Sequence, residues 1–367
     1  MTEFGVGTYT RNIIRALARV DRENEYFLLG SPEKAAEVGD LPENFHSVPT
    51  GPPDTTSGFW QCRSTLRREG CNIMHVPHLF WLPHHFPCPY VVTVHDLLDH
   101  MYRAHNGSGL KRTLHFQLTR RVLRNAARIF AVSQFTKSEL QKLFGIEPAK
   151  IEVIYNAIDS RFLTGHASEA DRQMLAERYQ IAYPFLLYAG RISPHKNLVR
   201  IIEAFAALKP ELAKQDQFPD LKLIIIGDEL SKHPDLRRTV VRAGVQNDVR
   251  FLGFVPIDVL RVFYDVAKVF VFPSLYEGFW LPPLEAMAHG TPVLTSNTSS
   301  IPEVVGRAAM LVNPENLFEM MRALQRVLCD QALRDKLRQA GYEQVKKFSW
   351  EHSVSEILAG YEEVVRS

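Results

Sequence analysis

The fold class is decided by one stretch of sequence, VFVFPSLYEGFWLPPLEAMAHG, which spans residues 269–290. Residues 269–272 are a short apolar run stopped by Pro273, and such a run predicts a buried parallel strand. Residues 284–289 predict a helix, because Pro283 suits its first turn and Gly290 suits its C-terminal end. A buried strand that leads through a loop into a helix is typical of an open α/β sheet.

This stretch carries two carboxylates, Glu277 on the predicted loop and Glu285 in the first turns of the predicted helix. In open α/β sheets, ligands bind at the carboxyl ends of the strands, where such loops lie. The first N–H groups of the helix attract anions at the same place. Alternatively, Glu285 only complements the helix dipole and Glu277 is a solvated surface acid. Both interpretations stay open on this stretch alone.

Length and composition point to a soluble protein of two domains. A chain of 367 residues exceeds one average domain, and its 46% hydrophobic and 23% charged residues are ordinary for a globular protein. A net charge of +2 gives no reason to expect nucleic acid as a partner. The four cysteines lack metal-site spacing, and no apolar run is long enough for a bilayer span or a signal peptide. We therefore expect reduced cysteines and a cytoplasmic protein.

Two series of alternating strands and helices predict two Rossmann-like, doubly wound parallel-sheet domains. Strands of the first series are expected at residues 25–30, 45–49, 72–76, 90–94, 127–132 and 151–155. Strands of the second series are expected at residues 185–189, 221–226, 249–252, 269–272 and 292–295. The domain limits that follow are residues 1–165, a linker at 166–182, residues 183–350, and a last helix at 351–367 that could pack on either half.

A second charged loop follows the first strand of the second series, at residues 190–197 (GRISPHKN). Gly190 lets the chain turn, and Arg191 and Lys196 then flank a loop that enters a helix. This arrangement suits a diphosphate, because arginine can bind it bidentately and lysine can act as a point charge. The alternative is a pair of solvated surface cations. The loop has neither the Walker A pattern nor a GxGxxG pattern, which disfavours a dinucleotide cofactor.

Three residues of the first half could contact the same kind of ligand. Gly5 and Gly7 precede a helix and could let the backbone approach a phosphate or sugar, although an ordinary turn is equally consistent. His95 directly follows the strand at 90–94 and could hydrogen-bond a sugar hydroxyl or a leaving group. A structural histidine is the alternative.

Two further groups of residues are less specific. His75, His78, His84 and His85 lie close together in sequence, but their spacing fits no metal site, so they are expected to line an acceptor cleft or decorate a loop. Residues 110–130 are basic and contain no acid. They predict either a helix that contacts anionic lipid or a solvated helix at the edge of the core.

Taken together, these motifs resemble the retaining glycosyltransferases of family GT4, which have the GT-B architecture of two Rossmann-like domains facing a cleft. The resemblance rests on the two charged loops and covers nearly the whole chain. It also rests on residues 5–9 (GVGTY), 154–159 (IYNAID), 290–293 (GTPV), 302–306 (PEVVG) and 348–351 (FSWE).

The resemblance implies a nucleotide-diphosphate sugar as co-substrate, linked to GDP or UDP, with no other cofactor and no metal. Catalytic roles would fall to His95, Arg191, Lys196 and Glu277, with the two cations neutralising the diphosphate as it leaves. Glu285 would accept hydrogen bonds from the ribose hydroxyls. The remaining donor contacts would come from Gly5, Gly7, Gly190, Phe251, Gly278, Phe279, Trp280 and Leu281. The final helix would cross back to the first domain.

The sequence departs from the family pattern in two places. Trp280 stands where the family usually has glycine, so its bulky ring is expected either to narrow the loop beside the donor sugar or to stack on a nearby group. An apolar strand normally precedes the Gly-rich loop, and here only Met1–Phe4 precede Gly5. The sheet of the first domain is therefore expected to lack its inner strand.

The resulting expectation is a retaining, metal-independent hexosyltransferase, with mannose slightly preferred over glucose. Its acceptor would be a glycan or a lipid-linked molecule at the inner membrane face, because residues 110–130 are basic. The alternatives are a GT-B epimerase, which needs no acceptor, and an inactive sugar-nucleotide-binding subunit.

Overall fold

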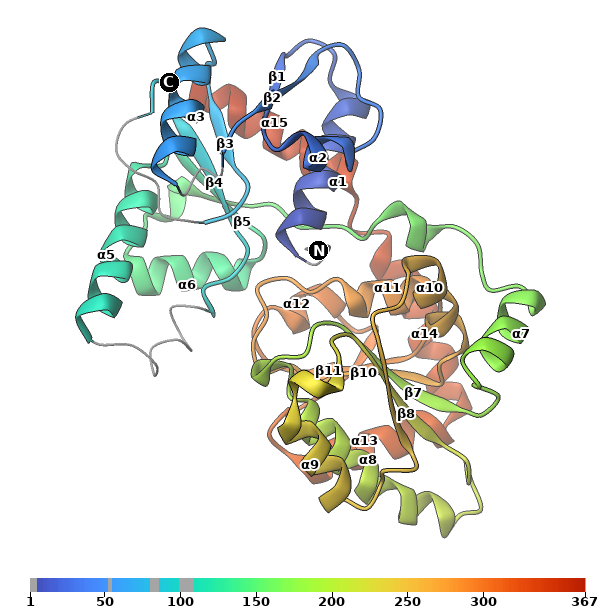
Figure 1. Ribbon diagram of the computed structural model, residues 1–367. Coiled ribbons are helices and arrows are strands. Elements are labelled where there is room, and N and C mark those ends of the chain that lie inside the picture. The colour runs from blue at the N-terminus through green and yellow to red at the C-terminus, as the bar shows by residue number, and fades with distance from the viewer. Residues whose placement is uncertain (1–4, 52–54, 80–85, 99–108, 367) are drawn as a thin grey trace. The chain divides into compact units, whose positions relative to one another are not determined.

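The computed structural model describes residues 5–51, 55–79, 86–98 and 109–366. The chain divides into two compact units (Figure 1). One unit comprises Met1–Ala157 with Phe348–Ser367, and the other comprises Ile158–Lys347. Parallel strands and surrounding helices build each unit. The predicted α/β class with two parallel-sheet units is therefore confirmed.

The second unit contains a six-stranded, wholly parallel sheet. Its central strands are buried along their whole length, which explains why their sequences are continuous apolar runs instead of alternating ones. In spatial order the strands are β12 (Ala309–Val312), β11 (Val293–Ser296), β10 (Val269–Phe272), β7 (Phe185–Ala189), β8 (Lys222–Ile226) and β9 (Val249–Gly253).

The strand order of this sheet reverses between β7 and β10. The chain runs from β7 to β8 and β9 on one side, and then returns to place β10 on the other side of β7. The loops that leave β7 and β10 therefore lie side by side at the carboxyl ends of these strands, which is where open α/β sheets bind ligands. Both charged loops predicted from the sequence lie at this switch point.

Helices cover both faces of the second sheet (Figure 1). One layer contains α8 and α13, which pack against each other, and the other contains α11 and α14, which also pack together. The helical segments are η3 (Ser160–Leu163), α7 (Glu169–Arg178), η4 (Pro194–Lys196), α8 (Leu198–Ala213), η5 (Leu230–Lys232), α9 (Pro234–Arg242), α10 (Ile257–Val266), α11 (Pro282–Ala288), α12 (Ile301–Val305), α13 (Leu317–Cys329) and α14 (Gln331–Val345).

The stretch expected to be a linker belongs to the second unit. The boundary between the units follows Ala157, so residues 158–182 lie with the second sheet. Within this stretch, α7 packs on α10, with Leu175 buried and the ring of Tyr179 5.6 Å from that of Phe263. The sequence signal was misleading because a short polar helix with few apolar positions resembles a connector.

The first unit contains two separate parallel sheets. One has β1 (Tyr26–Gly30) and β2 (Phe45–Pro49), and the other has β3 (Met74–Val76), β4 (Tyr90–Val94), β5 (Arg128–Ala131) and β6 (Ile151–Val153). The helical segments before residue 157 are α1 (Val6–Val20), α2 (Pro32–Ala36), α3 (Thr56–Arg68), α5 (Gly109–Asn125), α6 (Gln134–Phe144) and η2 (Pro148–Lys150).

Among the described residues, no strand joins β1 to β3. Residues of both strands line one cavity of about 860 Å³, together with Ile13 and Leu17 of α1. The cavity lies where an inner strand of a doubly wound sheet would pair with both neighbours.

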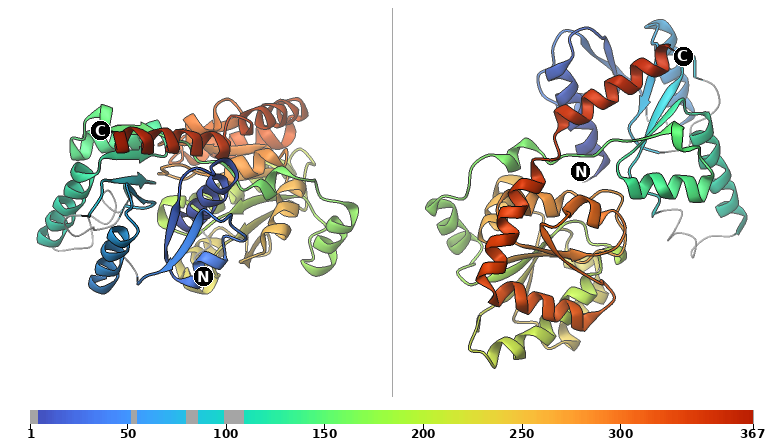
Figure 2. Two further views of the ribbon diagram at one scale, coloured as in Figure 1. Left: turned by 90° about the horizontal axis from the view of Figure 1, so that it is seen from above. Right: turned by 180° about the vertical axis from the view of Figure 1, so that it is seen from behind.

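The C-terminal helix α15 (Trp350–Arg366) completes the first unit, and Figure 2 shows it in red. It packs along α1 and against β5, with Trp350, Val354 and Ile357 buried. Its approach to β5 is close, because a Cβ at Gly360 would lie 2.9 Å from the ring of Phe130. The last helix therefore belongs with the first half of the chain.

Candidate active site

The loop after β7 requires glycine at its start. Gly190 has φ +149°, and a Cβ at Gly227 would collide with the carbonyl oxygen of Gly190. The Gly190 N–H donates to the carbonyl of Ile226 at 3.0 Å, which extends the pairing of β7 with β8 by one residue. The chain can turn out of the sheet at this point because neither glycine carries a side chain.

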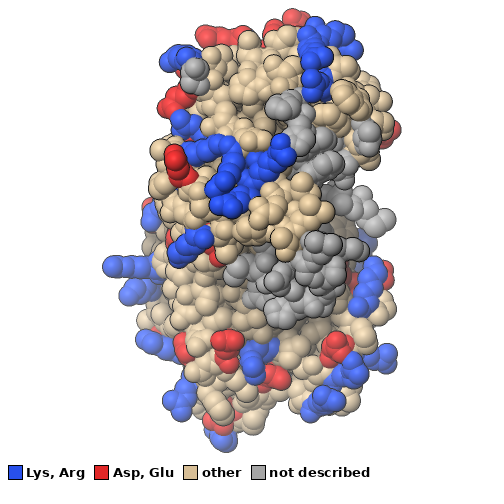
Figure 3. Space-filling view, turned by 90° about the vertical axis from the view of Figure 1, so that its left-hand side faces the viewer, with Lys and Arg blue, Asp and Glu red and all other residues tan. Residues whose placement is uncertain are grey.

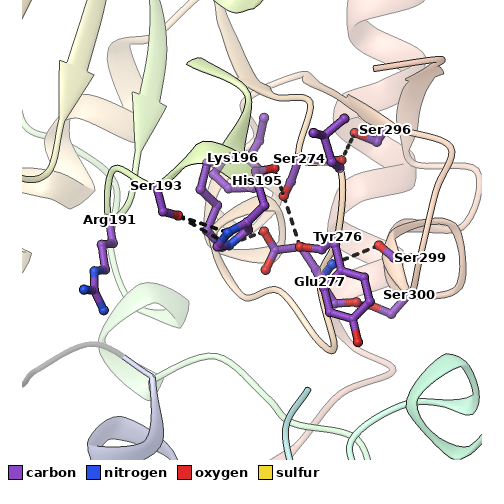
Figure 4. A network of polar contacts seen from close by, with 12 residues as sticks. Arg191, Ser193, His195, Lys196, Ser274, Tyr276, Glu277, Ser296, Ser299 and Ser300 are labelled. Atoms are coloured by element: carbon purple, nitrogen blue, oxygen red, sulfur yellow. Dashed lines mark hydrogen bonds and ion pairs between the residues drawn. The ribbon is translucent and has the colours of Figure 1, made fainter. Parts of the chain in front are cut away.

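Lys196 and Glu277 form a buried ion pair at the switch point (Figure 4). The Nζ of Lys196 donates to Oε1 of Glu277 at 2.5 Å, and the two side chains are 5% and 6% exposed. Two charges are rarely buried unless they are paired, because each loses its hydration. The structure thus brings together two residues that are 81 positions apart in the sequence.

Backbone contacts hold the two loops against each other. The N–H of Leu275 donates to the carbonyl of His195 at 2.7 Å, and the hydroxyl of Ser274 donates to the same carbonyl at 2.9 Å. Asn197, in the left-handed region at φ +62°, donates from Nδ2 to the carbonyl oxygens of Pro273 and Pro314. Lys196 therefore points toward Glu277 from a rigid turn.

The backbone of Glu277 is fixed by two serines from the segment before α12 (Figure 4). Its N–H donates to the hydroxyl oxygen of Ser299 at 3.1 Å, and the hydroxyl of Ser300 donates to its carbonyl at 2.9 Å. Sequence reasoning missed both serines. No sequence pattern identifies them, because they reach the site only through the pairing of β10 with β11.

The indole ring of Trp280 packs against two residues of the site. Its ring stacks on Phe272 with centroids 4.7 Å apart, and the Nζ of Lys196 lies 3.1 Å from its ring centroid. It also approaches Gly190, where a Cβ would lie 3.4 Å from the indole. A cation over an aromatic face is attracted by the ring quadrupole. Trp280 therefore contacts the lysine of the site directly.

Arg191 lies apart from the ion pair. Its side chain is exposed, and in Figure 4 its guanidinium points away from Lys196 and Glu277. Its backbone is held by Tyr188, whose hydroxyl donates to the Arg191 carbonyl at 2.9 Å. An exposed guanidinium on this loop is free to move toward an anion.

Glu285 is held by a residue that sequence reasoning missed. The hydroxyl of Tyr264, on α10, donates to Oε2 of Glu285 at 2.9 Å. Loss of solvation raises the pKa of Glu285 to about 7, the hydrogen bond from Tyr264 lowers it, and the nearby Asp159 raises it. A carboxyl group in this state changes charge near neutral pH.

The other predicted donor contacts of this unit lie on the same sheet edge. Gly278 and Phe279 are buried in the loop after Glu277, and Leu281 is the N-terminal cap residue of α11. Phe251 is half-buried near the carboxyl end of β9, the edge strand. Parallel strands present their carboxyl ends on one edge, so all four share the edge that carries the ion pair.

His95 lies in the first unit, directly after β4. Its Nε2 hydrogen donates to the carbonyl of Pro77 at 2.9 Å, and its ring meets that of Tyr9 edge-on at 4.5 Å. Burial lowers the pKa of His95 to about 4, so the ring is neutral at physiological pH.

The two glycines predicted to contact the donor lie at the start of α1. Gly5 is the N-terminal cap residue of α1, at φ +83°, and Gly7 lies in the first turn of that helix.

Of the histidines at residues 75–85, the structure describes His75 and His78, and the ring of His78 lies 6.1 Å from that of His95. His75 is bound between the hydroxyl groups of Tyr361 and Thr93, at 2.5 and 2.8 Å, and this links α15 to the sheet. Burial lowers the pKa of His75 to about 3. His84 and His85 lie outside the described residues.

Two parallel-sheet units and a pair of charged loops at a switch point define the GT-B class of glycosyltransferases. Solved structures of that class share this fold. Sucrose-phosphate synthase from Thermosynechococcus elongatus superposes with a TM-score of 0.77 at 21% identity, covering 98% of this chain and 94% of that chain. HepE from Anabaena, solved in complex with UDP-glucose, gives a TM-score of 0.74 at 18% identity, covering 97% of this chain and 96% of that chain.

The chain belongs to the glycosyltransferase group 1 family. The model of glycosyl transferases group 1 matches residues 174–344, and that of glycosyltransferase family 4 matches residues 5–162. The chain is 32% identical to O-antigen chain mannosyltransferase B of Escherichia coli over 294 residues, 79% of this chain and 74% of that protein. It is also 32% identical to the serotype-specific mannosyltransferase WbdA of Escherichia coli over 65% of this chain, but over only 29% of that longer protein.

Proposed function

We propose that the protein transfers a hexose, with mannose preferred over glucose, from a GDP- or UDP-linked sugar to a glycan or lipid-linked acceptor. One observation carries this proposal: Lys196 and Glu277 meet at the switch point of the second sheet, and the exposed Arg191 lies on the same loop as Lys196. A cation beside a carboxylate suits a donor that has an anionic leaving group next to a sugar with many hydroxyl groups.

Donor binding in this proposal exchanges the partners of the ion pair. The diphosphate replaces Glu277 as the partner of Lys196, and Glu277 then accepts hydrogen bonds from hydroxyl groups of the sugar. Arg191 closes on the same diphosphate, because its guanidinium is exposed and free to turn. Glu285 accepts hydrogen bonds from the ribose. Gly190, Phe251 and residues 278–281 supply the remaining contacts from this unit.

The transfer step breaks the bond between the anomeric carbon and the diphosphate oxygen, and forms a bond from that carbon to the acceptor hydroxyl oxygen. Negative charge grows on the departing oxygen, so fixed cations stabilise the transition state. The acceptor hydroxyl gives its proton to the departing diphosphate. Lys196 and Arg191 supply the positive charge that a metal ion would otherwise supply, so we propose a metal-independent reaction that retains the anomeric configuration.

The names of the relatives support mannose and a glycan acceptor. Two of them are mannosyltransferases, and one of these acts on an O-antigen chain by its name. The structure of HepE with UDP-glucose supports a nucleotide-diphosphate donor. His95, Gly5 and Gly7 belong to the other unit, and their predicted contacts with the donor are part of the same proposal.

We further propose that α5 gives the protein peripheral contact with anionic lipid at the cytoplasmic membrane face. Arg121 and Arg124 are exposed on α5, and Figure 3 shows a group of lysine and arginine side chains on one face of the molecule. The apolar residues of α5 mostly pack inward, since Leu123 is buried and Phe116 stacks on Phe144 at 4.7 Å. The contact is therefore electrostatic and weakens with salt. No helix in the described part of the chain has the length and apolarity for crossing a membrane.

The test combines donor screening with variants of the site. GDP-mannose, GDP-glucose, UDP-glucose and ADP-glucose are compared by thermal shift, and the stabilising donors are then assayed for transfer to mannoside and lipid-linked acceptors. We expect Lys196→Ala and Glu277→Ala to abolish transfer, while Lys214→Ala, which removes an exposed cation of the same unit, leaves it unchanged. Transfer that survives both site variants contradicts the proposal.

Two further measurements test the proposed reaction. NMR of the product tests whether the anomeric configuration is retained, and an activity assay after treatment with EDTA tests whether transfer is independent of metal.

A further inference from the structure

A second cluster of polar side chains lies in the unit of the candidate active site, formed by His166, Asp265 and His289. They come from the segment before α7, the last turn of α10 and the C-terminal cap of α11. One potential ligand atom from each residue lies within 4.8 Å of the others. The sequence separates these residues widely, so no motif marks them.

The distances in the cluster are close to those of a metal site. Oδ1 of Asp265 lies 2.9 Å from Nδ1 of His166 and 3.1 Å from Nδ1 of His289. Tetrahedral zinc, with bonds of about 2.0–2.2 Å to nitrogen and oxygen, separates neighbouring ligand atoms by about 3.3 Å. Lengthening the two distances from Oδ1 of Asp265 by a few tenths of an ångström, and bringing the imidazole rings of His166 and His289 closer together, would therefore give the ligand spacing of tetrahedral zinc.

His289 gives an independent sign that a partner belongs here. Its side chain is 1% exposed and its Nε2 makes no hydrogen bond, while its Nδ1 lies 3.1 Å from Oδ1 of Asp265. A buried polar group without a hydrogen bond is costly and rare in native proteins. The ring cannot easily turn away, because it stacks on Tyr264 at 6.0 Å and meets Phe162 edge-on at 6.1 Å. Its Nδ1 therefore stays directed at Asp265.

The other two residues are suited to complete such a site. Oδ2 of Asp265 accepts a hydrogen bond from the N–H of Ala167 at 2.7 Å, which orients the carboxylate as outer contacts orient metal ligands. The side chain of His166 is 63% exposed, which leaves a path for an ion and room for a water ligand.

The segment that carries His166 is held by hydrogen bonds to α10. Arg261 of α10 donates from its guanidinium to the carbonyl oxygens of Thr164 and Gly165. Little ordering is then required when a ligand binds, and preorganised sites bind more tightly for that reason.

We propose that His166, Asp265 and His289 bind one Zn²⁺ ion, with water as the fourth ligand, and that this ion fastens the segment before α7 to α10 and α11. Two imidazoles and a carboxylate suit zinc, whereas Mg²⁺ and Ca²⁺ prefer all-oxygen sites. The site is separate from the Lys196–Glu277 pair and takes no part in the proposed transfer.

The experiment measures metal binding by the full-length chain after removal of any polyhistidine tag and of bound metal with a chelator. Zn²⁺ is titrated by calorimetry, and Co²⁺ serves as a spectroscopic probe, because tetrahedral cobalt absorbs visible light far more strongly than octahedral cobalt. We expect one Zn²⁺ per chain, an intense cobalt spectrum, and a higher Tm in the presence of Zn²⁺.

Two variants and a matched control assign the site. His166→Ala removes an exposed ligand and should fold normally, and we expect it to weaken Zn²⁺ binding at least tenfold and to remove the Zn²⁺-dependent rise in Tm. Asp265→Asn should also weaken Zn²⁺ binding at least tenfold and remove the Zn²⁺-dependent rise in Tm. His352→Ala removes an exposed histidine that lies 3.5 Å from Glu356 on α15, and it should bind Zn²⁺ like the wild type. Absence of stoichiometric binding to the wild type, or unchanged binding by His166→Ala, overturns the proposal.

Discussion

The Nζ of Lys196 lies 2.5 Å from Oε1 of Glu277 and 3.1 Å from the centroid of the Trp280 ring. The lysine of the candidate site thus has a carboxylate and an aromatic face as partners. Any anion that binds Lys196 must compete with both. This relationship leads to the first two predictions.

Removing one member of the Lys196–Glu277 pair should destabilise the protein strongly. Either Lys196→Met or Glu277→Gln leaves the other charge buried and uncompensated, which costs about 3–5 kcal/mol of unfolding free energy. The double variant should cost less than the sum of the two single ones, because it leaves no unpaired charge. Urea denaturation measures the free energy of unfolding of all three variants.

The Arg200–Glu203 pair provides the control for this prediction. Its side chains are 37% and 38% exposed, so Glu203→Gln should change the unfolding free energy by less than about 1 kcal/mol. A cost of less than about 1 kcal/mol for Glu277→Gln would contradict the burial of the Lys196–Glu277 pair.

Trp280 should report donor binding by its fluorescence. A diphosphate that takes Lys196 as its partner moves the ammonium away from the indole ring, and the emission of that ring depends on nearby charge. We expect a donor such as GDP-mannose to change the tryptophan emission of the wild type. Trp280→Phe keeps an aromatic face for Lys196, so this variant should still bind the donor. Its tryptophan emission should not change when the donor binds. Replacing Trp60, an exposed tryptophan of the other unit, should leave the change intact.

Donor affinity should depend on pH through Glu285. The pKa of Glu285 is raised from 4.5 to about 7 by burial, so the folded protein holds this proton more tightly than the unfolded chain does. The stabilisation that comes from this proton is complete below about pH 4.5, and is lost as the pH rises through about 7. A ribose hydroxyl, in contrast, donates best to the ionised carboxylate. Donor binding should therefore strengthen as the pH rises through about 7, and level off above it.

Two variants test this assignment. Glu285→Gln should bind the donor more weakly, with little pH dependence in that range. Tyr264→Phe removes the hydrogen bond that lowers the pKa of Glu285. The midpoint of the pH dependence of donor binding should therefore move to higher pH in this variant. Calorimetry with an intact sugar nucleotide is suitable, since its diphosphate does not titrate near neutrality. A pH-independent affinity of the wild type contradicts a role for Glu285 in binding.

A side chain at Gly360 should loosen the C-terminal helix from the first unit. The added methyl group of Gly360→Ala would lie 2.9 Å from the ring of Phe130, and overpacking of this kind costs about 1–3 kcal/mol. Ser355→Ala, at an exposed position of the same helix, should change the unfolding free energy by no more than about 0.5 kcal/mol. Equal stabilities of the two variants would show that α15 does not pack on β5.

The sequence by itself determined the local elements and the residues of the two charged loops. The strand at 269–272, the helix after Pro283 and the turn at Gly190 were predictable because apolar runs, proline and glycine act within a few residues. Their order also placed both loops at carboxyl ends of parallel strands. The short strand β12 was missed, since four residues carry too little pattern to distinguish a strand from a loop.

Only the tertiary structure decided which side chains meet. Lys196 reaches Glu277 because β10 returns to the far side of β7, and Ser299 and Ser300 reach it because β11 lies beside β10. The contact of Tyr264 with Glu285 depends in the same way on how helices pack over the sheet. Such contacts join residues far apart in the chain, so their geometry follows from strand order and packing, which no local pattern of residues encodes.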